Sequence, residues 1–221
     1  MLQENSKLSI IVPVFNEVNI IDKFIPSLTD AFEKINCKYI FVDDGSTDGT
    51  SEKIQKLLET NFKEKEFKYK KFNQNYGKAE AVKEGIKHID SDYTLLIDSD
   101  LEYSPNDALE IYNIALENKS IDIIQGSRYL GAKVQARKYI FNDLAVRINT
   151  LLFNFLFSQS ITDLHTGTKI VKSKLLKSLN LSYRRFGLEI NINSQIAKKN
   201  IYIYEYGIGY IERSKEDGKK I

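Results

Sequence analysis

Residues 95–105 read LLIDSDLEYSP, an apolar run that ends in three acidic side chains at alternating positions, followed by a proline. The apolar residues predict a buried β-strand, and Asp98, Asp100 and Glu102 follow at its end. Carboxylates placed so close together repel one another, so the cluster requires a cation nearby. The stretch therefore predicts a strand whose carboxyl end carries an acidic site.

The same succession of apolar strand and polar turn recurs along the first 125 residues, with an amphipathic segment after each turn. Strand patterns cover 8–14, 38–44, 67–72, 93–98 and 121–126, and helical patterns lie near 18–35, 50–60, 77–89 and 105–118. This alternation predicts an α/β fold with a mostly parallel central sheet and helices on both faces. In such sheets ligands bind beyond the carboxyl ends of the strands.

Several acidic residues follow the predicted strands and should share that edge of the sheet: Glu17, Asp43, Asp44, Asp98 and Asp100. Two carboxylates two positions apart in a loop can face one Mg²⁺ or Mn²⁺, which prefers oxygen ligands and keeps positions open for substrate phosphates. The acids can equally serve the positive end of the next helix, because Ser104-Pro105 is a typical helix start. A metal–diphosphate site and a helix cap both stay open at this point.

Other chemistries with similar residues are excluded by missing partners. Phosphatases of the haloacid dehalogenase type need a threonine where this chain has Glu102, and neither a Gly-Lys-Ser/Thr loop nor a Gly-x-Gly-x-x-Gly fingerprint is present. With only His88 and His165, a Ser-His-Asp triad is not indicated. No helix-turn-helix or zinc-finger pattern points to a nucleic-acid partner.

The 221 residues suit one continuous domain, 1–221, whose halves differ in charge. Residues 1–125 hold 15 Lys and Arg against 23 Asp and Glu, whereas residues 126–221 hold 17 against 7. This asymmetry predicts an acidic, metal-using half beside a basic half that meets an anion. With the single Cys37 and no signal peptide pattern, we expect a reducing, cytoplasmic setting.

The second half contains one long helical pattern, 140–158, with a narrow polar stripe on an otherwise apolar circumference. The stripe consists of Asp143, Arg147, Thr150, Asn154 and Ser158. A helix buried in the core, a helix lying in the membrane interface and a homodimer contact are its three interpretations. Farther along, alternation over 201–211 predicts a strand, and the mixed charges of 63–71 predict an exposed edge strand.

Five stretches occur in an order and at spacings that identify a family: LSIIVPVFNE (8–17), YIFVDDGSTDGT (39–50), NQNYGKAEAVKEGI (73–86), LLIDSDLEYSP (95–105) and IIQGSRYLG (123–131). Together they resemble family 2 glycosyltransferases, which have the GT-A fold. The later stretches resemble the branch that contains dolichol-phosphate mannose synthases and bacterial polyprenyl-phosphate glycosyltransferases: TDLHTGTKIVKSKLLKSLNL (162–181), RRFGLEINI (184–192) and ERSKEDGKKI (212–221). The resemblance implies a metal-dependent, inverting transfer of a hexose from a UDP- or GDP-sugar to a polyprenyl phosphate.

The resemblance also implies roles for matching residues on the donor side. The nucleotide sugar would be bound by Pro13, Phe15, Glu17, Asp43, Asp44, Lys78, Asp98, Ser99, Asp100, Arg213 and Lys219. Asp98 and Asp100 match the metal-binding Asp-x-Asp motif for Mg²⁺ or Mn²⁺, and Glu102 stands near the metal where the mannose synthases usually have Gln. Arg213 and Lys219 match a basic pair that closes over phosphate groups.

On the acceptor side, Arg128 and either Arg137 or Lys138 resemble the arginines that meet the acceptor phosphate. Planar guanidinium groups bind phosphate in bidentate fashion, and a phosphate acceptor is already an oxyanion that needs no strong base. Asp163 is then either a general base for a hydroxyl acceptor or the residue that organises the arginines. We count Asp163, Arg128 and Arg137 as the catalytic candidates.

Three functions remain as alternatives. The preferred one is hexosyl transfer to a polyprenyl phosphate by a protein in peripheral contact with the cytoplasmic face of a membrane. The others are transfer to a hydroxyl of a cell-surface glycan or lipid, and a non-catalytic nucleotide-sugar-binding module. His165 and Asn191 stand where the branch often has acidic residues, and these departures affect the acceptor prediction more than the donor prediction.

Overall fold

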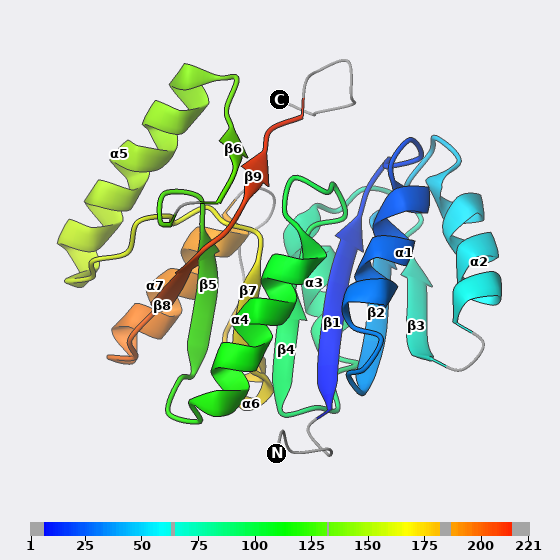
Figure 1. Cartoon of the computed structure of the whole chain (residues 1–221), viewed down its shortest axis with the longest axis horizontal. Helices are drawn as coiled ribbons and strands as arrows, with labels where there is room; N and C mark the ends of the chain where they lie inside the picture. The colour runs from blue at the N-terminus through cyan, green and yellow to red at the C-terminus, as the bar shows by residue number, and fades with distance from the viewer. Residues whose placement is uncertain (1–6, 63–64, 132, 182–186, 214–221) are drawn as a thin grey trace.

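The computed structural model describes residues 7–62, 65–131, 133–181 and 187–213. Its centre is a seven-stranded sheet (Figure 1). From edge to edge the strands are β3 (Glu66–Lys71), β2 (Cys37–Asp43), β1 (Leu8–Val14), β4 (Tyr93–Leu96), β7 (Lys169–Lys172), β5 (Ile123–Ser127) and β8 (Tyr204–Gly207). A two-stranded sheet pairs β6 (Gln135–Ala136) with β9 (Tyr210–Ile211). The predicted α/β fold with a mostly parallel sheet is confirmed.

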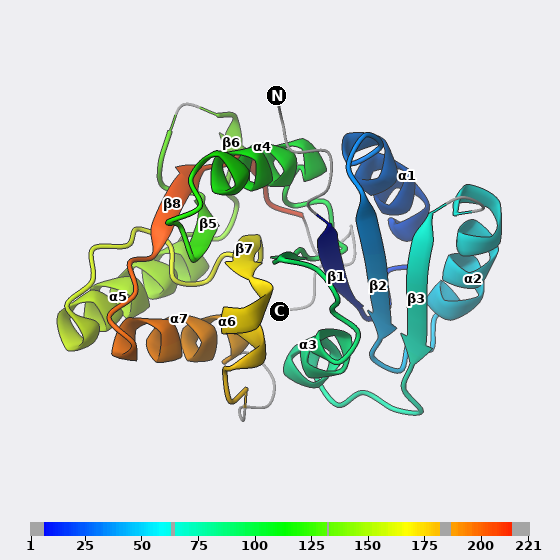
Figure 2. The same ribbon diagram turned by 90° about the horizontal axis from the view of Figure 1, so that it is seen from below.

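Helices cover both faces of the large sheet (Figure 2). One face carries α1 (Ile21–Ala31), α2 (Thr50–Asn61) and α4 (Pro105–Glu117), and the other carries α3 (Lys78–Ile86), α6 (Ser173–Lys177) and α7 (Leu188–Lys198). The remaining helix, α5 (Ile140–Phe157), lies at the side of the molecule and contacts α7. Each helical pattern predicted in the first half overlaps one of α1 to α4, and the predicted exposed edge strand is β3.

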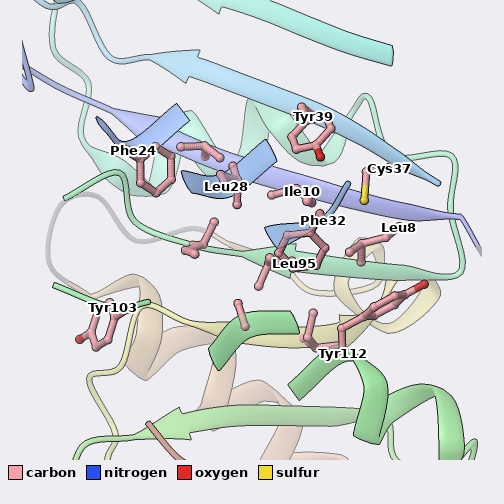
Figure 3. Close-up of a cluster of buried hydrophobic side chains, with 14 of the residues drawn as sticks. Leu8, Ile10, Phe24, Leu28, Phe32, Cys37, Tyr39, Leu95, Tyr103 and Tyr112 are labelled. Carbon is pink, nitrogen blue, oxygen red and sulfur yellow. The ribbon is translucent and has the colours of Figure 1, made fainter. Parts of the chain in front are cut away.

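The sheet interior explains why its strands are unbroken apolar runs. β1 pairs in parallel with both β2 and β4, and its successive side chains point to opposite faces. Leu8 and Ile10 pack in the cluster formed with Phe24 and Phe32 of α1, as Figure 3 shows, whereas Ile11 belongs to the cluster on the α3 face. All five side chains are fully buried, so a polar residue at any of these positions would be costly.

Strand β7 lies outside the predicted strands. It runs antiparallel between β4 and β5, with Ile170 opposite both Leu95 and Ile124. Its sequence, KIVK, begins and ends with lysine and so lacks an apolar strand pattern, yet Lys169 is only 1% exposed. Because β7 comes from the second half and pairs with β4 of the first, the two halves share one sheet.

The prediction of a single strand over 201–211 is wrong. β8 ends at Gly207 in the large sheet beside β5, and β9 begins at Tyr210 in the small sheet. The break follows from close packing, because a Cβ atom on Gly207 would lie 2.4 Å from the carbonyl oxygen of Leu130. The chain therefore leaves the large sheet at this point and crosses towards the acidic loop after β4 (Figure 1).

The helix predicted over 140–158 is present as α5, but its interpretation as a buried core helix is wrong. Within α5 only Thr150 and Phe153 are buried, whereas Phe141 and Phe155 are 83% and 84% exposed. Among the described residues α5 is the one helix long and apolar enough to cross a membrane, judged by length and composition. Its exposed apolar side chains leave the interface interpretations open.

Candidate active site

The acidic cluster lies in the loop after β4, and each aspartate has a cationic neighbour. Asp98 Oδ1 is 2.6 Å from Lys78 Nζ at the start of α3, and the same ammonium group is 2.6 Å from Glu189 Oε1 of α7. Asp100 Oδ2 lies 3.8 Å from Arg213 Nη2. A lysine and an arginine therefore supply the positive charge that the sequence of this loop requires.

Asp98 can take its place because residue 167 is a glycine. A Cβ atom on Gly167 would lie 2.0 Å from Asp98 Oδ2, well inside van der Waals contact. Gly167 belongs to the segment that leads into β7, so the unpredicted strand brings the second half of the chain against the acidic loop. Sequence reasoning missed this residue, although it lies within the TDLHTGT stretch that carries the family resemblance.

Asp100 is the carboxylate with the strongest need for a further cation. Burial and the charges of Asp98 and Glu102 raise the pKa of Asp100 from 3.8 to about 7. Across the described ranges no three His, Cys, Asp or Glu side chains come together to hold a metal ion by themselves. Asp98 and Asp100 nevertheless fit Mg²⁺ or Mn²⁺, because Mg²⁺ commonly binds one or two carboxylates and shares its other positions with substrate phosphates.

Glu102 and Arg213 hold the segment after β9 across the acidic loop. Glu102 accepts hydrogen bonds from Tyr210 Oη at 3.1 Å and from the backbone N–H of Arg213 at 3.0 Å. The Arg213 guanidinium donates to both carboxylate oxygens of Glu17, at 2.7 and 3.2 Å. Its Nε is buried and has no hydrogen-bond partner among the described residues. Lys219, the other predicted basic residue of the tail, lies outside the described residues.

Asp43 and Asp44 shape the loops beside the site. Asp43 Oδ1 accepts the backbone N–H of Ser46 at 2.8 Å, and Asp44 accepts those of Tyr76 and Gly77 at 2.7 and 2.8 Å. Both carboxylates are buried, and burial raises the pKa of Asp44. These two predicted donor-binding residues thus fix the backbone that borders the carboxyl edge of the sheet.

The remaining predicted donor-binding residues lie at the same edge. Pro13 and Phe15 are half-buried where β1 ends, and Ser99 Oγ donates to the carbonyl oxygen of Pro13 at 3.2 Å. Pro13 also borders a small hollow beside Lys78 and Asp98. The structure therefore brings together the predicted donor-side residues that it describes.

A cavity of about 250 Å³ opens on the other side of the acidic loop. Arg128 and Arg137, from the segment after β5, contribute to its lining together with His165. Glu102 forms part of the wall towards the acidic cluster, and Asn142 of α5 forms part of the opposite wall. The predicted acceptor-side arginines therefore meet in one hollow, next to the predicted donor side.

Both carboxylate oxygens of Asp163 are hydrogen-bonded to Arg128. Arg128 Nε and Nη2 donate to its two oxygens at 2.7 Å each, and the backbone N–H groups of Arg128 and His165 donate at 3.1 and 3.2 Å. Although burial alone would raise it, these bonds and the charge of Arg128 hold the pKa of Asp163 below its ordinary value. A fully paired carboxylate of low pKa is a poor proton acceptor, so the geometry favours the organising role over the general-base role.

Arg137 is positioned by an aromatic ring and a carboxylate. Its guanidinium lies 4.1 Å from the centroid of the Tyr129 ring, and its Nη1 is 2.7 Å from Asp143 Oδ1. Arg147 lies 4.5 Å from the centroid of the same ring, and Tyr129 Oη donates to Asp143 at 2.7 Å. Arg137 lines the cavity, whereas Lys138 is exposed, so the structure favours Arg137 of the two predicted alternatives.

A buried polar network holds the backbone of Asp163 in place. Gln125 Nε2 donates to the carbonyl oxygen of Asp163 at 2.8 Å and to Glu205 Oε1 at 3.1 Å, and Glu205 accepts the Asp163 backbone N–H at 3.0 Å. Lys169 Nζ donates to Gln125 Oε1, and burial lowers the pKa of Lys169 to about 8. Sequence reasoning missed this network, because its members come from three strands and carry no local motif.

Comparison with known protein families gives a match over most of the chain. The model of the family described as Glycosyl transferase family 2 matches residues 9–179. The dolichyl-phosphate beta-glucosyltransferase of Saccharomyces cerevisiae is 31% identical, over 97% of this chain and 69% of that protein. The dolichol-phosphate mannosyltransferase of Pyrococcus furiosus is 28% identical, over 97% of this chain and 60% of that protein.

Solved structures agree with the fold. Glucosyl-3-phosphoglycerate synthase from Mycobacterium tuberculosis, in complex with Mn²⁺, uridine diphosphate and phosphoglyceric acid, superposes with a TM-score of 0.75. The match is 18% identical and covers 98% of this chain and 74% of that one. The same enzyme with Mg²⁺ and uridine diphosphate gives a TM-score of 0.75 at 17% identity, over 98% of this chain and 75% of that one. At this identity the likeness establishes the GT-A fold alone.

Proposed function

The chain belongs to glycosyl transferase family 2, and we propose that this hexosyltransferase moves its sugar from a nucleoside-diphosphate donor to a polyprenyl phosphate. The observation that carries the proposal is the arginine-lined cavity beside the acidic loop, in which Asp163 is paired with Arg128. A hydroxyl acceptor would need a free base to remove its proton, whereas a phosphate oxygen is already an anion.

The acceptor phosphate would lie against Arg128 and Arg137. Asp163 fixes the guanidinium plane of Arg128, and Asp143 with the Tyr129 ring fixes that of Arg137, so neither side chain has to be ordered when the phosphate binds. Guanidinium N–H groups form strong, charge-assisted hydrogen bonds to phosphate oxygens. The relatives from yeast and Pyrococcus furiosus, whose names include a dolichyl or dolichol phosphate, support this acceptor class.

The donor diphosphate would lie between the acidic loop and Arg213. Arg213, whose Nη2 lies 3.8 Å from Asp100 Oδ2, supplies positive charge at this point. Asp98 and Asp100 would hold Mg²⁺ or Mn²⁺ together with the diphosphate, and a bound ion would neutralise the charge that develops on this leaving group. The structures of the mycobacterial enzyme with Mn²⁺ or Mg²⁺ and uridine diphosphate support a divalent ion and a UDP-sugar, and a GDP-sugar is the alternative donor.

The reaction that this arrangement suits is a single displacement. An oxygen of the acceptor phosphate attacks the anomeric carbon while the bond from that carbon to the diphosphate oxygen breaks, and the configuration inverts. No proton has to be removed from the acceptor. Since nucleotide sugars are cytoplasmic metabolites, we propose that the transfer takes place at the cytoplasmic face of a membrane.

One observation favours the hydroxyl acceptor as a second candidate. His165 lines the cavity, and burial lowers its pKa, so the imidazole is neutral at pH 7 and can accept a proton. In that mechanism His165, rather than Asp163, would be the base. Replacement of His165 by Gln should then abolish transfer, whereas transfer to a phosphate should tolerate it.

The proposal is tested by a screen of donors and acceptors. Purified protein with Mg²⁺ or Mn²⁺ would receive UDP- and GDP-hexoses with and without polyprenyl phosphate, and release of the nucleoside diphosphate would be followed. We expect release that depends on the lipid phosphate, that is lost in Asp100→Ala and that persists in Asp122→Ala, an acid ahead of β5 at the other end of the strands. Release without lipid would be hydrolysis of the donor by water and would count against the lipid acceptor, and nucleotide binding without any transfer would favour the binding module.

A further inference from the structure

The polarity of α5 is reversed relative to an ordinary surface helix, because its polar stripe faces the protein. Asp143 accepts from Tyr129 Oη at 2.7 Å, and Asn154 exchanges hydrogen bonds with the backbone of Ile161 at 2.7 and 3.1 Å. Thr150 Oγ1 accepts a backbone N–H from the segment after the helix at 3.2 Å. These bonds orient the helix, and they leave its apolar side chains facing solvent.

The outer face of α5 is a continuous apolar surface. Its large side chains are between 49% and 84% exposed. They are Ile140, Phe141, Leu144, Ile148, Leu151, Leu152, Phe155 and Leu156. Together they present on the order of 1,000 Å² of apolar surface, whereas the largest apolar patch on a typical soluble monomer is a few hundred Å². A surface of this size indicates a partner.

The width of the outer face distinguishes between partners. With about 100° per residue, its side chains cover an arc of roughly 160° around the helix axis. A two-stranded coiled coil buries only a narrow stripe of two positions per seven residues, so a second copy of α5 would leave much of this face in water. A helix that crosses a bilayer is also excluded, because the opposite arc is bonded to the domain. A broad, flat apolar environment is the one that can cover the whole outer face of α5.

The position of the outer face relative to the cavity points to lipid. Asn142 and Val146 of α5 line the cavity, and Phe141 and Leu144 of the outer face are their neighbours along the helix. Arg147 is 58% exposed at the rim of the face. The second half of the chain carries 17 Lys and Arg against 7 Asp and Glu, which favours a surface of negative charge.

We propose that the outer face of α5 docks the protein on the surface of an anionic lipid bilayer. Docking brings the arginine-lined cavity level with the lipid headgroups, so that a phosphate on a membrane-embedded chain reaches Arg128 and Arg137 without leaving the bilayer. This deepens the proposed function and rests on it for the identity of the acceptor. The attachment itself depends only on the apolar face and the charge around it.

Binding to vesicles that contain no acceptor tests the attachment separately. Wild type and Leu151→Asp/Phe155→Asp would be sedimented with vesicles of phosphatidylcholine and about a quarter phosphatidylglycerol. We expect the double variant to bind at least about tenfold more weakly, because two charges would enter the apolar boundary. The control is Phe67→Asp, an exposed aromatic on the far edge strand β3. Wild type that stays in the supernatant, or equal binding by the double variant, would overturn the proposal.

Two further measurements distinguish lipid docking from dimer formation and from damage to the active site. If light scattering shows a wild-type dimer that the double variant dissociates, and vesicles bind neither protein, then a second copy covers the face and the proposal is wrong. Transfer to a short, water-soluble polyprenyl phosphate should persist in the double variant, because its site is intact. Vesicle binding with no transfer to any acceptor would uphold the docking surface and refute the proposed function.

Discussion

Gly167 lies so close to Asp98 that adding a single methyl group at residue 167 should change the shape of the acidic loop. In Gly167→Ala the new Cβ would start 2.0 Å from Asp98 Oδ2, so the carboxylate must shift from its position beside Lys78. A shift of about 1 Å at a reacting site can cost about 100-fold in rate, and we expect a loss of that order with the fold retained. Steady-state kinetics with a thermal melt measures both. Gly209→Ala, whose Cβ would start 3.4 Å from the carbonyl oxygen of Val134, is the matched control, and equal activity of the two variants would contradict the assignment.

The two possible roles of Asp163 predict different kinetic effects of a substitution, because an organising residue and a general base act on different steps. If it organises Arg128, Asp163→Asn should raise the KM for the acceptor about 100-fold and leave donor binding unchanged, since the guanidinium is no longer held in place. If it were the base, kcat would collapse at unchanged KM, and the acid limb of the pH profile would disappear.

The same variant should also unfold more easily. Removing one partner of a buried ion pair typically costs about 3–5 kcal/mol, so kinetics are best measured well below the melting temperature. Asp122→Asn is the matched control. A variant with normal acceptor KM and normal stability would refute the organising role.

Asp100 makes stability depend on pH in a predictable direction. Its pKa is about 7 in the folded protein against 3.8 for an ordinary Asp. The folded state therefore holds a proton that the unfolded chain has released between pH 4 and 7, and stability falls as pH rises through this window. In metal-free buffer the free energy of unfolding of Asp100→Asn should be close to that of wild type near pH 4 and should exceed it by about 4 kcal/mol at pH 8, which is the energy equivalent of a pKa raised from 3.8 to about 7. Thermal melts across this range measure the difference, and parallel pH curves for the two proteins would contradict the raised pKa.

At the scale of elements, β9 and the residues after it connect parts of the site that are distant in sequence. The β9 segment pairs with β6, contacts Glu102 beside the acidic loop, and places Glu212 at the start of α5. There Glu212 Oε2 accepts the backbone N–H groups of Lys138 and Tyr139 at 2.6 and 3.2 Å. The donor side and α5 are thus linked through a few hydrogen bonds of one short segment.

Glu212→Gln tests that link. The neutral amide keeps one acceptor oxygen but loses the charge that strengthens hydrogen bonds near a helix start, so we expect a loss of about 1 kcal/mol, or roughly 2–4 °C in melting temperature. Glu117→Gln, exposed at the end of α4, should melt like wild type. If the two variants melt together, Glu212 contributes nothing to the attachment of α5.

Sequence patterns predicted the elements of the first half, whereas in the second half they predicted α5 but missed β7 and the division between β8 and β9. Parallel strands such as β1 are buried on both faces, so they must be apolar throughout and are recognisable. β7 is also central, but its Lys169 is accommodated by Gln125 rather than by water, and no local pattern shows this. The segment 201–211 alternates like one strand, and the close approach of Gly207 to Leu130 that divides it is a tertiary contact.

At the scale of the whole molecule, the site lies where the acidic half, residues 1–125, meets the basic half, residues 126–221. β7 inserts the second half next to β4, so that Gly167 and Glu189 lie beside the acidic loop, and the basic cavity opens on its other side. The sequence predicted which side chains gather at the carboxyl edge of the sheet. It did not predict that the cation next to Asp98 is Lys78, because that contact depends on how α3 and α7 pack.

The central claim is that the acceptor is a phosphate oxygen, held by Arg128 and Arg137, and not a hydroxyl. The most direct measurement compares polyprenyl phosphate with the polyprenol of the same chain length, each given with the donor identified by the screen. Both carry the same tail and differ only in the head group, a phosphate in one and a hydroxyl in the other. We predict a kcat/KM at least about 100-fold higher for the phosphate, because the arginines have no anion to bind in the alcohol. Equal transfer to the polyprenol would contradict the account and would make His165 the base to examine.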